Sequence, residues 1–298
     1  MSENPSSAAP ANKVATTTRS SYDGRPVALL TQHGKLQALA PVLHKVLGCT
    51  IELVSGYNTD LLGTFTRDIP RQGTQLEAAR RKAQIGMALS GLSLGLASEG
   101  SFGADPVAGM FPWNVELLIW IDTERELEVI GLAQGNASFG HLLTGDWNAV
   151  VGFAQEMAFP SHRLVVRPAS EEGLPVRKGI DTWSELQSAF QEALGLANNG
   201  LVFVESDVRA HTNPTRMAMI GLAAEDLAKK LSSLCPACRS PGFAAVELIR
   251  GLSCAACHAP TQEMRAEVFG CVKCDHRVIH ERNDQQFADP GRCNFCNP

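Results

Sequence analysis

The stretch TQLEAARRKAQIGMALSGLSLGLASEGSFG at residues 74–103 decides the fold. Its apolar side chains recur at helical spacing at Leu76, Ala79, Ala83 and Met87. This spacing predicts a helix that begins at a capping box on Thr74 and ends at Gly91. The apolar run 94–97 then predicts a short buried strand, and Glu99 follows it directly. Because ligands bind beyond the carboxyl ends of strands in α/β sheets, we expect Glu99 to lie at a ligand site.

The composition bounds the class of protein. The chain has 298 residues, of which 44% are hydrophobic, enough for one large domain and a small one, or for two medium domains. A formal net charge of -5 creates no overall attraction to nucleic acid or to an anionic membrane. The longest uncharged apolar run, 83–98, is too short to span a bilayer, and the N-terminus lacks the pattern of a signal peptide. We therefore expect a cytoplasmic protein with no membrane partner.

The rest of the chain predicts three parts. Residues 1–24 are rich in Ser, Ala, Thr and Pro without periodicity, which is typical of a disordered tail. Residues 25–234 alternate between strand and helix patterns and predict an α/β domain. Within this domain the expected strands are 27–31, 50–54, 94–97, 115–122, 127–133, 162–167 and 201–205. The fourth and fifth form an antiparallel hairpin, so the sheet should be mixed. Residues 235–298 form a small cysteine-rich domain.

A second polar group follows the strand expected at 201–205. It contains Glu205, Asp207, Arg209, His211 and Arg216, and it precedes a helix that Asn213 caps. A helix N-terminus favours anions, and two polar groups at strand ends of one sheet suggest a single site. The alternative is that Asp207 and Arg209 pair with each other and that His211 is a surface residue.

Four segments of the α/β domain resemble the superfamily of inosine triphosphate pyrophosphatases. They are the turn Thr31-Gln-His33-Gly-Lys35, the helix segment 74–83, the acidic motif Glu99-Gly100-Ser101 and Arg216 at the start of the last helix. His33 and Ala78 stand where these relatives carry Asn. The resemblance implies an α/β fold of three layers around a mixed sheet. It also implies hydrolysis of non-standard nucleoside triphosphates to monophosphates with a divalent cation.

The same resemblance implies roles for individual residues. Glu99 and Asp207, with Glu205 as an alternative to Asp207, would be the catalytic carboxylates and would hold Mg²⁺, which prefers oxygen ligands. The groups expected to bind phosphate or substrate are His33, Lys35, Lys82, Arg209 and Arg216. The competing hypothesis is a domain of the same kind that senses a nucleotide, or has only a structural role, without catalysis.

The cysteines carry the most specific pattern in the chain. Eight of the nine fall in the last 64 residues. They form four CxxC pairs: Cys235 with Cys238, Cys254 with Cys257, Cys271 with Cys274 and Cys293 with Cys296. Eight thiolates are enough for two structural Cys₄ zinc sites, as in zinc ribbons. Metal binding would supply folding free energy that so short a segment cannot obtain from a core. A redox or disulfide role is the alternative.

The pairing of the four CxxC motifs is open at this point. A strand pattern at 266–270 enters the third motif and another at 276–279 leaves it. This favours one ion on Cys254, Cys257, Cys271 and Cys274, and the other on the outer four cysteines. Sequential pairing of the first two and the last two motifs is the alternative. His258 and His276 exceed the ligand count and are expected not to bind metal.

The charge of the cysteine-rich domain bears on its partner. Residues 235–298 contain seven Lys or Arg and seven Asp or Glu. A neutral module is poorly suited to a phosphate backbone, so nucleic acid is the less favoured partner. Docking on the α/β domain, or binding another protein, fits this composition better.

Overall fold

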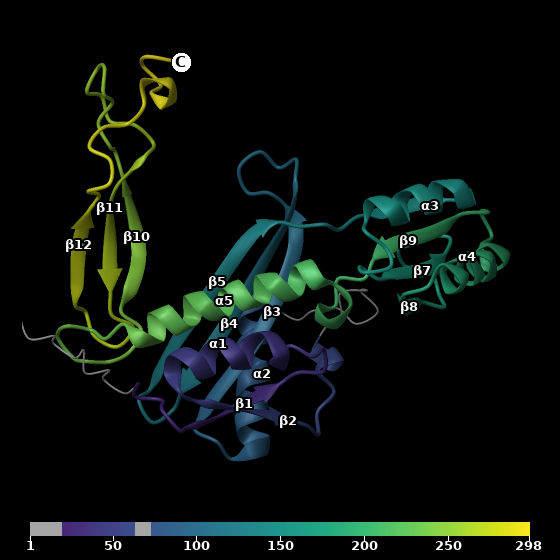
Figure 1. Cartoon of the computed structure of the whole chain (residues 1–298), viewed down its shortest axis with the longest axis horizontal. Helices are drawn as coiled ribbons and strands as arrows, with labels where there is room; N and C mark the ends of the chain where they lie inside the picture. The colour runs from purple at the N-terminus through teal and green to yellow at the C-terminus, as the bar shows by residue number, and fades with distance from the viewer. Residues whose placement is uncertain (1–19, 63–72) are drawn as a thin grey trace, which may run out of the picture.

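The computed structural model describes residues 20–62 and 73–298 (Figure 1). Most of the tail expected at 1–24 lies outside the described residues, and so do residues 63–72, which precede the helix expected to begin at Thr74. The described chain forms an α/β protein with two mixed or antiparallel sheets and a cysteine-rich arm at its C-terminal end.

The first sheet has five strands in the order β2-β1-β3-β4-β5. They are β1 (Pro26–Leu30), β2 (Thr50–Val54), β3 (Leu94–Ala104), β4 (Pro112–Asp122) and β5 (Leu127–Asn136). β1 is parallel to β2 and β3, whereas β3, β4 and β5 are antiparallel. The mixed sheet and the expected hairpin are therefore confirmed.

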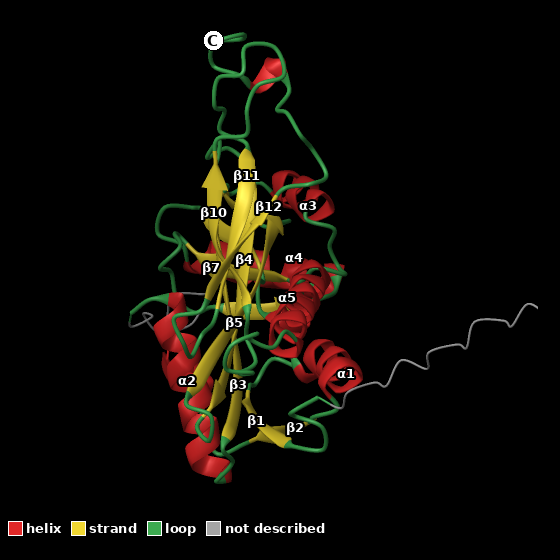
Figure 2. Cartoon of the chain, turned by 90° about the vertical axis from the view of Figure 1, so that its left-hand side faces the viewer, coloured by secondary structure: helices red, strands yellow, loops and turns green. Residues whose placement is uncertain are grey.

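Helices cover both faces of this sheet. α1 (Leu36–Leu47) and α5 (Pro214–Ser232) pack on one face, where Leu43 and Leu227 share a core with Trp120. α2 (Gln75–Ser90) packs on the other face, where Ala83 meets Ile119. Figure 2 shows α2 on one side of the strands and α1 with α5 on the other. The α/β part thus has three layers around the first sheet.

The helix ends follow the local chemistry of the sequence. The Thr74 side chain accepts a hydrogen bond from the Glu77 amide, and the Glu77 carboxylate accepts one from the Thr74 amide, so α2 begins at a complete capping box. It ends at Gly91, whose φ of 71° lies in the left-handed region that favours glycine. Asn213 caps α5 through the amide of Arg216. These expected boundaries are confirmed.

The strand expected at 94–97 is longer than predicted. β1 pairs with β3 only at Gly95 and Leu96, but β4 pairs with it without a break from Leu94 to Ala104. The antiparallel partner therefore extends β3 by seven residues beyond the apolar run. As a consequence Glu99 lies inside a strand, and the expectation that it follows the strand is wrong.

The second sheet has four antiparallel strands in the order β6-β9-β7-β8. They are β6 (His141–Thr144), β7 (Leu164–Pro168), β8 (Arg177–Ile180) and β9 (Val202–Ser206), covered by α3 (Trp147–Glu156) and α4 (Trp183–Leu196). Glu205 belongs to β9 of the second sheet, whereas Glu99 belongs to β3 of the first sheet. The prediction that the two polar groups lie on one sheet is therefore wrong. α5 then returns the chain to the first sheet.

The C-terminal arm contains a three-stranded antiparallel sheet in the order β10-β11-β12. Its strands are β10 (Ala244–Arg250), β11 (Met264–Gly270) and β12 (Arg277–Glu281). Figure 1 shows the arm rising from the C-terminal end of α5, away from the second sheet. Three short 3₁₀ helices complete the described elements: η1 (Thr59–Leu62), η2 (Ala210–Thr212) and η3 (Pro290–Arg292). None of the helices described here is long and apolar enough to cross a membrane.

Gly131 sets the distance between β5 and α5. A Cβ placed on it would lie 2.5 Å from Leu227 Cβ and 2.6 Å from the Ala223 carbonyl oxygen, neither of which can move without shifting the helix. We expect Gly131→Ala to lower the free energy of unfolding by about 1–3 kcal/mol through overpacking, measured by urea denaturation. Gly135→Ala is the matched control, because its Cβ would meet only the flexible end of Met219 at 3.2 Å. Equal stability of the two variants would contradict this account.

Candidate functional site

Lys82 and Glu99 form an ion pair between α2 and β3. Their side chains are 14% and 5% exposed, so solvent screens the pair only weakly. Gln75, the first residue of α2, donates a hydrogen bond of 2.7 Å to the Glu99 carbonyl oxygen and accepts one from Ser101. The acidic motif is therefore held against the N-terminal half of α2.

Lys35 approaches the same strand from the other side. It lies at the N-cap position of α1, and its Nζ donates to the Ser98 carbonyl oxygen at 2.7 Å. That carbonyl is accessible because the paired part of β1 ends opposite Leu96. Burial, with a smaller effect from the charge of Arg216, lowers the pKa of the Lys35 amine to about 7, while the charge of Glu99 opposes the shift.

Arg216 and Glu116 form a fully buried ion pair. The Arg216 Nε donates to Glu116 Oε1 at 2.7 Å, and the two side chains are 1% and 0% exposed. Gly100 makes this pair possible, since a Cβ there would lie 2.3 Å from Glu116 Oε1 and 2.4 Å from Arg216 Nη2. The second oxygen of Glu116 has no hydrogen-bond partner in the described chain. Sequence reasoning missed Glu116, although a carboxylate inside the apolar run 115–121 is a signal for it.

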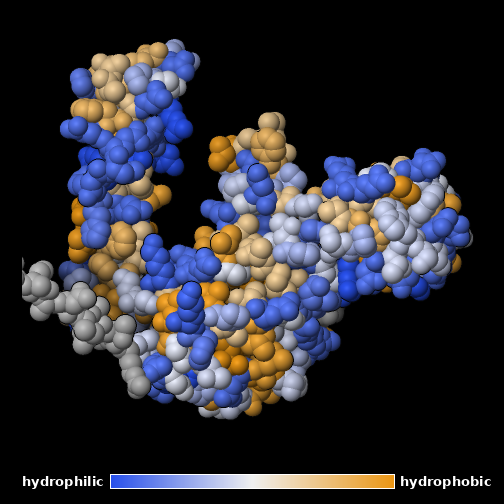
Figure 3. Space-filling view, viewed as in Figure 1, coloured by the Kyte–Doolittle hydropathy of each residue, from blue (hydrophilic) through white to orange (hydrophobic). Residues whose placement is uncertain are grey.

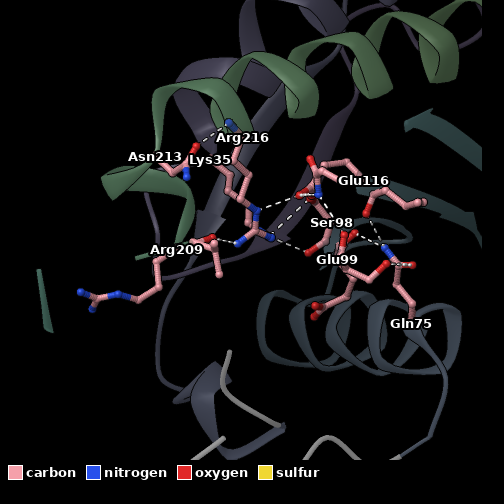
Figure 4. Close-up of polar contacts among 12 residues, drawn as sticks. Lys35, Gln75, Ser98, Glu99, Glu116, Arg209, Asn213 and Arg216 are labelled. Atoms are coloured by element: carbon pink, nitrogen blue, oxygen red, sulfur yellow. Dashed lines mark hydrogen bonds and ion pairs between the residues drawn. The ribbon is translucent and has the colours of Figure 1, made fainter. Parts of the chain in front are cut away.

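These residues meet at one position on the first sheet. The register places Glu99 on the α2 face, with Leu117, and places Ser98 and Glu116 on the face of α1 and α5. Lys35, Lys82 and Arg216 therefore approach β3 and β4 from three helices and from both faces. Figure 4 shows Lys35, Ser98, Glu99, Glu116 and Arg216 close together. With Lys82, which pairs with Glu99, they form what we call the β3 cluster. It holds three cationic side chains and two carboxylates.

The second polar group of the sequence is arranged differently. Arg209 donates to both oxygens of Asp207, at 2.9 and 2.6 Å, and Glu205 pairs with Arg167 of β7. Figure 4 shows the Arg209 side chain extending away from the β3 cluster. Burial alone would raise the pKa of Asp207, but the hydrogen bonds and charge of Arg209 outweigh it and lower the pKa. Asp207 and Arg209 therefore pair with each other, which was the alternative to a single shared site in the sequence analysis.

His33 and His211 connect the two groups. Their rings stack with centroids 5.2 Å apart, so the turn after β1 touches η2. Burial lowers the pKa of His211, and the charge of Arg209 adds to this effect. Both imidazoles are therefore placed beside the Lys35 turn, whereas Asp207 and Arg209 pair outside the β3 cluster.

The eight arm cysteines form two groups of four thiols. Neighbouring Sγ atoms lie 3.7 Å apart for Cys235 and Cys274, and 3.8 Å apart for Cys254 and Cys296. Zn–S bonds of about 2.3 Å in a tetrahedron place the sulfurs about 3.8 Å apart, so each group fits this ion. A disulfide needs about 2.05 Å, and all of these cysteines are free. His258 and His276 belong to neither group within the described chain.

The pairing of the CxxC motifs differs from both sequence expectations. One group contains Cys235, Cys238, Cys271 and Cys274, and the other contains Cys254, Cys257, Cys293 and Cys296. The motifs therefore alternate along the chain. The reason is that one strand of the arm lies between each motif and the next, so successive motifs fall at opposite ends of the arm sheet. The strand β10 is not among those expected from the sequence, and the signal for it is the mostly apolar run Ala-Ala-Val-Glu-Leu-Ile-Arg between two CxxC motifs.

The first cysteine group fastens the arm to the α/β part. Lys273, inside the third CxxC motif, donates to the Arg125 carbonyl oxygen in the β4–β5 turn and lies 3.6 Å from the Glu126 carboxylate. The Gly242 amide bonds the Lys230 carbonyl oxygen of α5 at 3.1 Å. We call this group the proximal cysteine group and the other the distal cysteine group.

The fold and these groups define an α/β protein with a mixed and an antiparallel sheet, and with a C-terminal arm that carries two tetracysteine groups whose geometry suits a metal ion. The chain belongs to the family described as Domain of unknown function (DUF6671), whose model matches residues 82–298. The matched region holds Lys82, Glu99, Glu116, Arg216 and all eight arm cysteines, whereas His33 and Lys35 precede it. No curated protein and no solved structure matches the chain at a significant level.

The lowered pKa of Lys35 predicts a pH dependence of stability. The folded chain releases this proton near pH 7 and the unfolded chain near pH 10.5, so between these values the unfolded state binds more protons. The free energy of unfolding of the wild type should therefore rise with pH over this window relative to Lys35→Met, and the difference should be constant below it. Urea denaturation of both proteins from pH 6 to 9 measures this. Parallel profiles would contradict the shift.

The alternating cysteine pairing predicts the metal content of double variants. Cys238→Ser with Cys271→Ser damages only the proximal cysteine group and should leave one zinc ion per chain. Cys257→Ser with Cys271→Ser damages both groups and should leave none tightly bound, because a structural site needs four ligands. Metal analysis of the wild type should give two zinc ions. Retention of one ion by the second double variant would contradict the pairing.

Proposed function

We propose that the β3 cluster binds the phosphates of a nucleotide and that the protein hydrolyses a phosphoanhydride bond of that nucleotide. The observation that carries this proposal is the excess of cationic groups around Lys35. Its pKa is affected by two cations, Arg216 and Lys82, and by two carboxylates, Glu99 and Glu116. With Lys35 itself, the cluster contains three cationic side chains and two carboxylates. An anion added to the cluster would balance this charge and would favour the protonated form of Lys35. Cationic side chains from several elements are typical of phosphate sites.

A divalent cation is part of this proposal. Glu99 would hold Mg²⁺ on the α2 face of the sheet, while the unpartnered, fully buried oxygen of Glu116 lies on the opposite face. For Glu99 to bind the cation, Lys82 would have to break its ion pair with Glu99 and contact a phosphate group instead. When bound, the cation would neutralise charge that develops on the phosphate oxygens during attack by water. Arg216 and Lys35 would then position the phosphates.

The finer fold class belongs to the same proposal. We infer that residues 25–234 are a divergent member of the inosine triphosphate pyrophosphatase superfamily, which the motifs at Lys35, 74–83, Glu99 and Arg216 favour. The order of a strand, a helix, a strand, a helix and a long hairpin agrees with this assignment. Non-standard nucleoside triphosphates are accordingly the first substrates to test.

A second candidate function is nucleotide binding without turnover. It is favoured by the ion pairs of Glu99 with Lys82 and of Glu116 with Arg216, which occupy both carboxylates of the cluster. In either case we propose that the two tetracysteine groups hold structural zinc and that the arm contacts a protein partner. Its seven cationic and seven acidic residues do not favour nucleic acid.

Pyrophosphate release with Mg²⁺ and a panel of standard and non-standard nucleoside triphosphates tests the proposal. We expect turnover by the wild type and a loss on the order of 100-fold in Glu99→Gln, the scale of removing one positioned catalytic group. Glu128→Gln is the matched control, because Glu128 also pairs with a residue of α2, Arg80, but lies outside the β3 cluster. It should keep full activity.

Calorimetric titration of the same nucleotides separates the two candidates. Binding without turnover would support the non-catalytic function and remove the hydrolase. The absence of both binding and turnover, with the wild type folded and loaded with zinc, would overturn the assignment of the β3 cluster to nucleotides.

A further inference from the structure

The loop that joins β3 to β4 is held rigid by one carboxylate. Asp105 is 8% exposed and accepts four backbone hydrogen bonds, from Val107 at 3.1 Å, Ala108 at 2.6 Å, Met110 at 2.7 Å and Phe111 at 2.8 Å. These bonds, above all the one from Phe111, hold the pKa of Asp105 well below its ordinary range. The loop is therefore ordered before any partner binds.

This rigid loop displays apolar side chains. Val107 is 95% exposed, Met110 75% and Phe111 55%. We call these three side chains the hairpin knob. Figure 3 shows apolar surface at the tip of this hairpin, which stands clear of both the arm and the second sheet. Three large apolar side chains together on a solvent-exposed tip are typical of a contact surface.

The end of the molecule around the knob is nearly free of charge. Asp105 is the only Asp, Glu, Lys or Arg in residues 101–115, and residues 131–145 contain none. A surface without cations does not attract nucleic acid or anionic lipid. We therefore expect the partner to offer a mostly apolar surface of matching size.

Such a surface lies at the foot of the same hairpin. A hollow of about 650 Å³ extends from Pro112 to α3 and is lined by apolar side chains that include Phe139, Leu142, Phe153 and Met157. Glu156 is its one charged lining residue. The Ala137 amide bonds the Pro112 carbonyl oxygen at 2.9 Å, so the rim of the hollow is fixed to the base of the knob.

From this geometry we infer that the occupant of the hollow is the hairpin knob of a second copy of this chain. The knob and the hollow meet at Pro112, which follows Phe111 and lines the hollow. Together they can form a self-complementary patch, in which a two-fold axis places the knob of each copy in the hollow of the other. The loop is already ordered by Asp105, so little conformational entropy is lost on docking. The flexible Met110 side chain can adapt to the hollow.

Analytical ultracentrifugation of the full zinc-loaded chain tests the homodimer. The wild type should sediment as a dimer of the 32.0 kDa chain. Val107→Asp should raise the dissociation constant on the order of 100-fold or more, because it places an unpaired charge in the contact. Leu248→Asp is the control, since Leu248 is 58% exposed but lies on the arm. Val107→Asp should not destabilise the monomer, because Val107 is exposed and Asp105 binds only backbone amides, which the substitution leaves in place. A thermal melt of the variant checks this.

Glu156 provides a second, sign-dependent test. Val107→Lys would place a positive charge in the hollow that Glu156 of the other copy lines, so it should weaken the dimer less than Val107→Asp. The order should reverse when both variants also carry Glu156→Lys. A wild type that stays monomeric at every soluble concentration would overturn the inference, and so would a dimer that Val107→Asp leaves intact.

Discussion

The unbroken antiparallel pairing of β3 with β4 is the interaction on which the rest of the α/β part depends. Eleven residue pairs, from Leu94 with Asp122 to Ala104 with Pro112, fix which side chains face α2 and which face α1 and α5. Because side chains alternate along a strand, this register alone separates Glu99 from Glu116 and aligns each with a cation from a different helix. The same pairing carries the hairpin beyond the helices and into solvent.

The buried charges of the β3 cluster restrict the sequence around them. An ion pair such as Arg216 with Glu116 loses most of its hydration, so each partner is needed to compensate the other. Gly100 is required at the point where the two side chains cross the strand, since any Cβ would enter the space of both. The acidic motif Glu99-Gly100-Ser101 thus contains one charged residue, one position limited by space and one hydroxyl that anchors Gln75.

Most helices and strands could be predicted from the sequence, but which strands pair with one another could not. Capping residues Thr74 and Asn213 and the terminal Gly91 located the helices, because a cap is a local interaction. The apolar run 94–97 does not show the full length of β3, because that length depends on pairing with β4, whose residues lie 8 to 28 positions later in the chain. Glu205 was assigned to the wrong sheet because strand pairing is not visible in a local pattern. Of the β3 cluster, Lys35, Lys82, Glu99 and Arg216 were identified from patterns. Glu116 was missed because its role depends on Arg216, 100 residues later.

The alternating order of the cysteine motifs affects how the arm can be inherited. If the first two motifs held one ion and the last two the other, a cut between Cys257 and Cys271 would leave two complete zinc fingers. In this arm the same cut separates each tetracysteine group into two pairs and leaves no complete group. Gene duplication or recombination at that midpoint therefore cannot yield a working half. The arm can be gained, lost or transferred to another protein only as a whole.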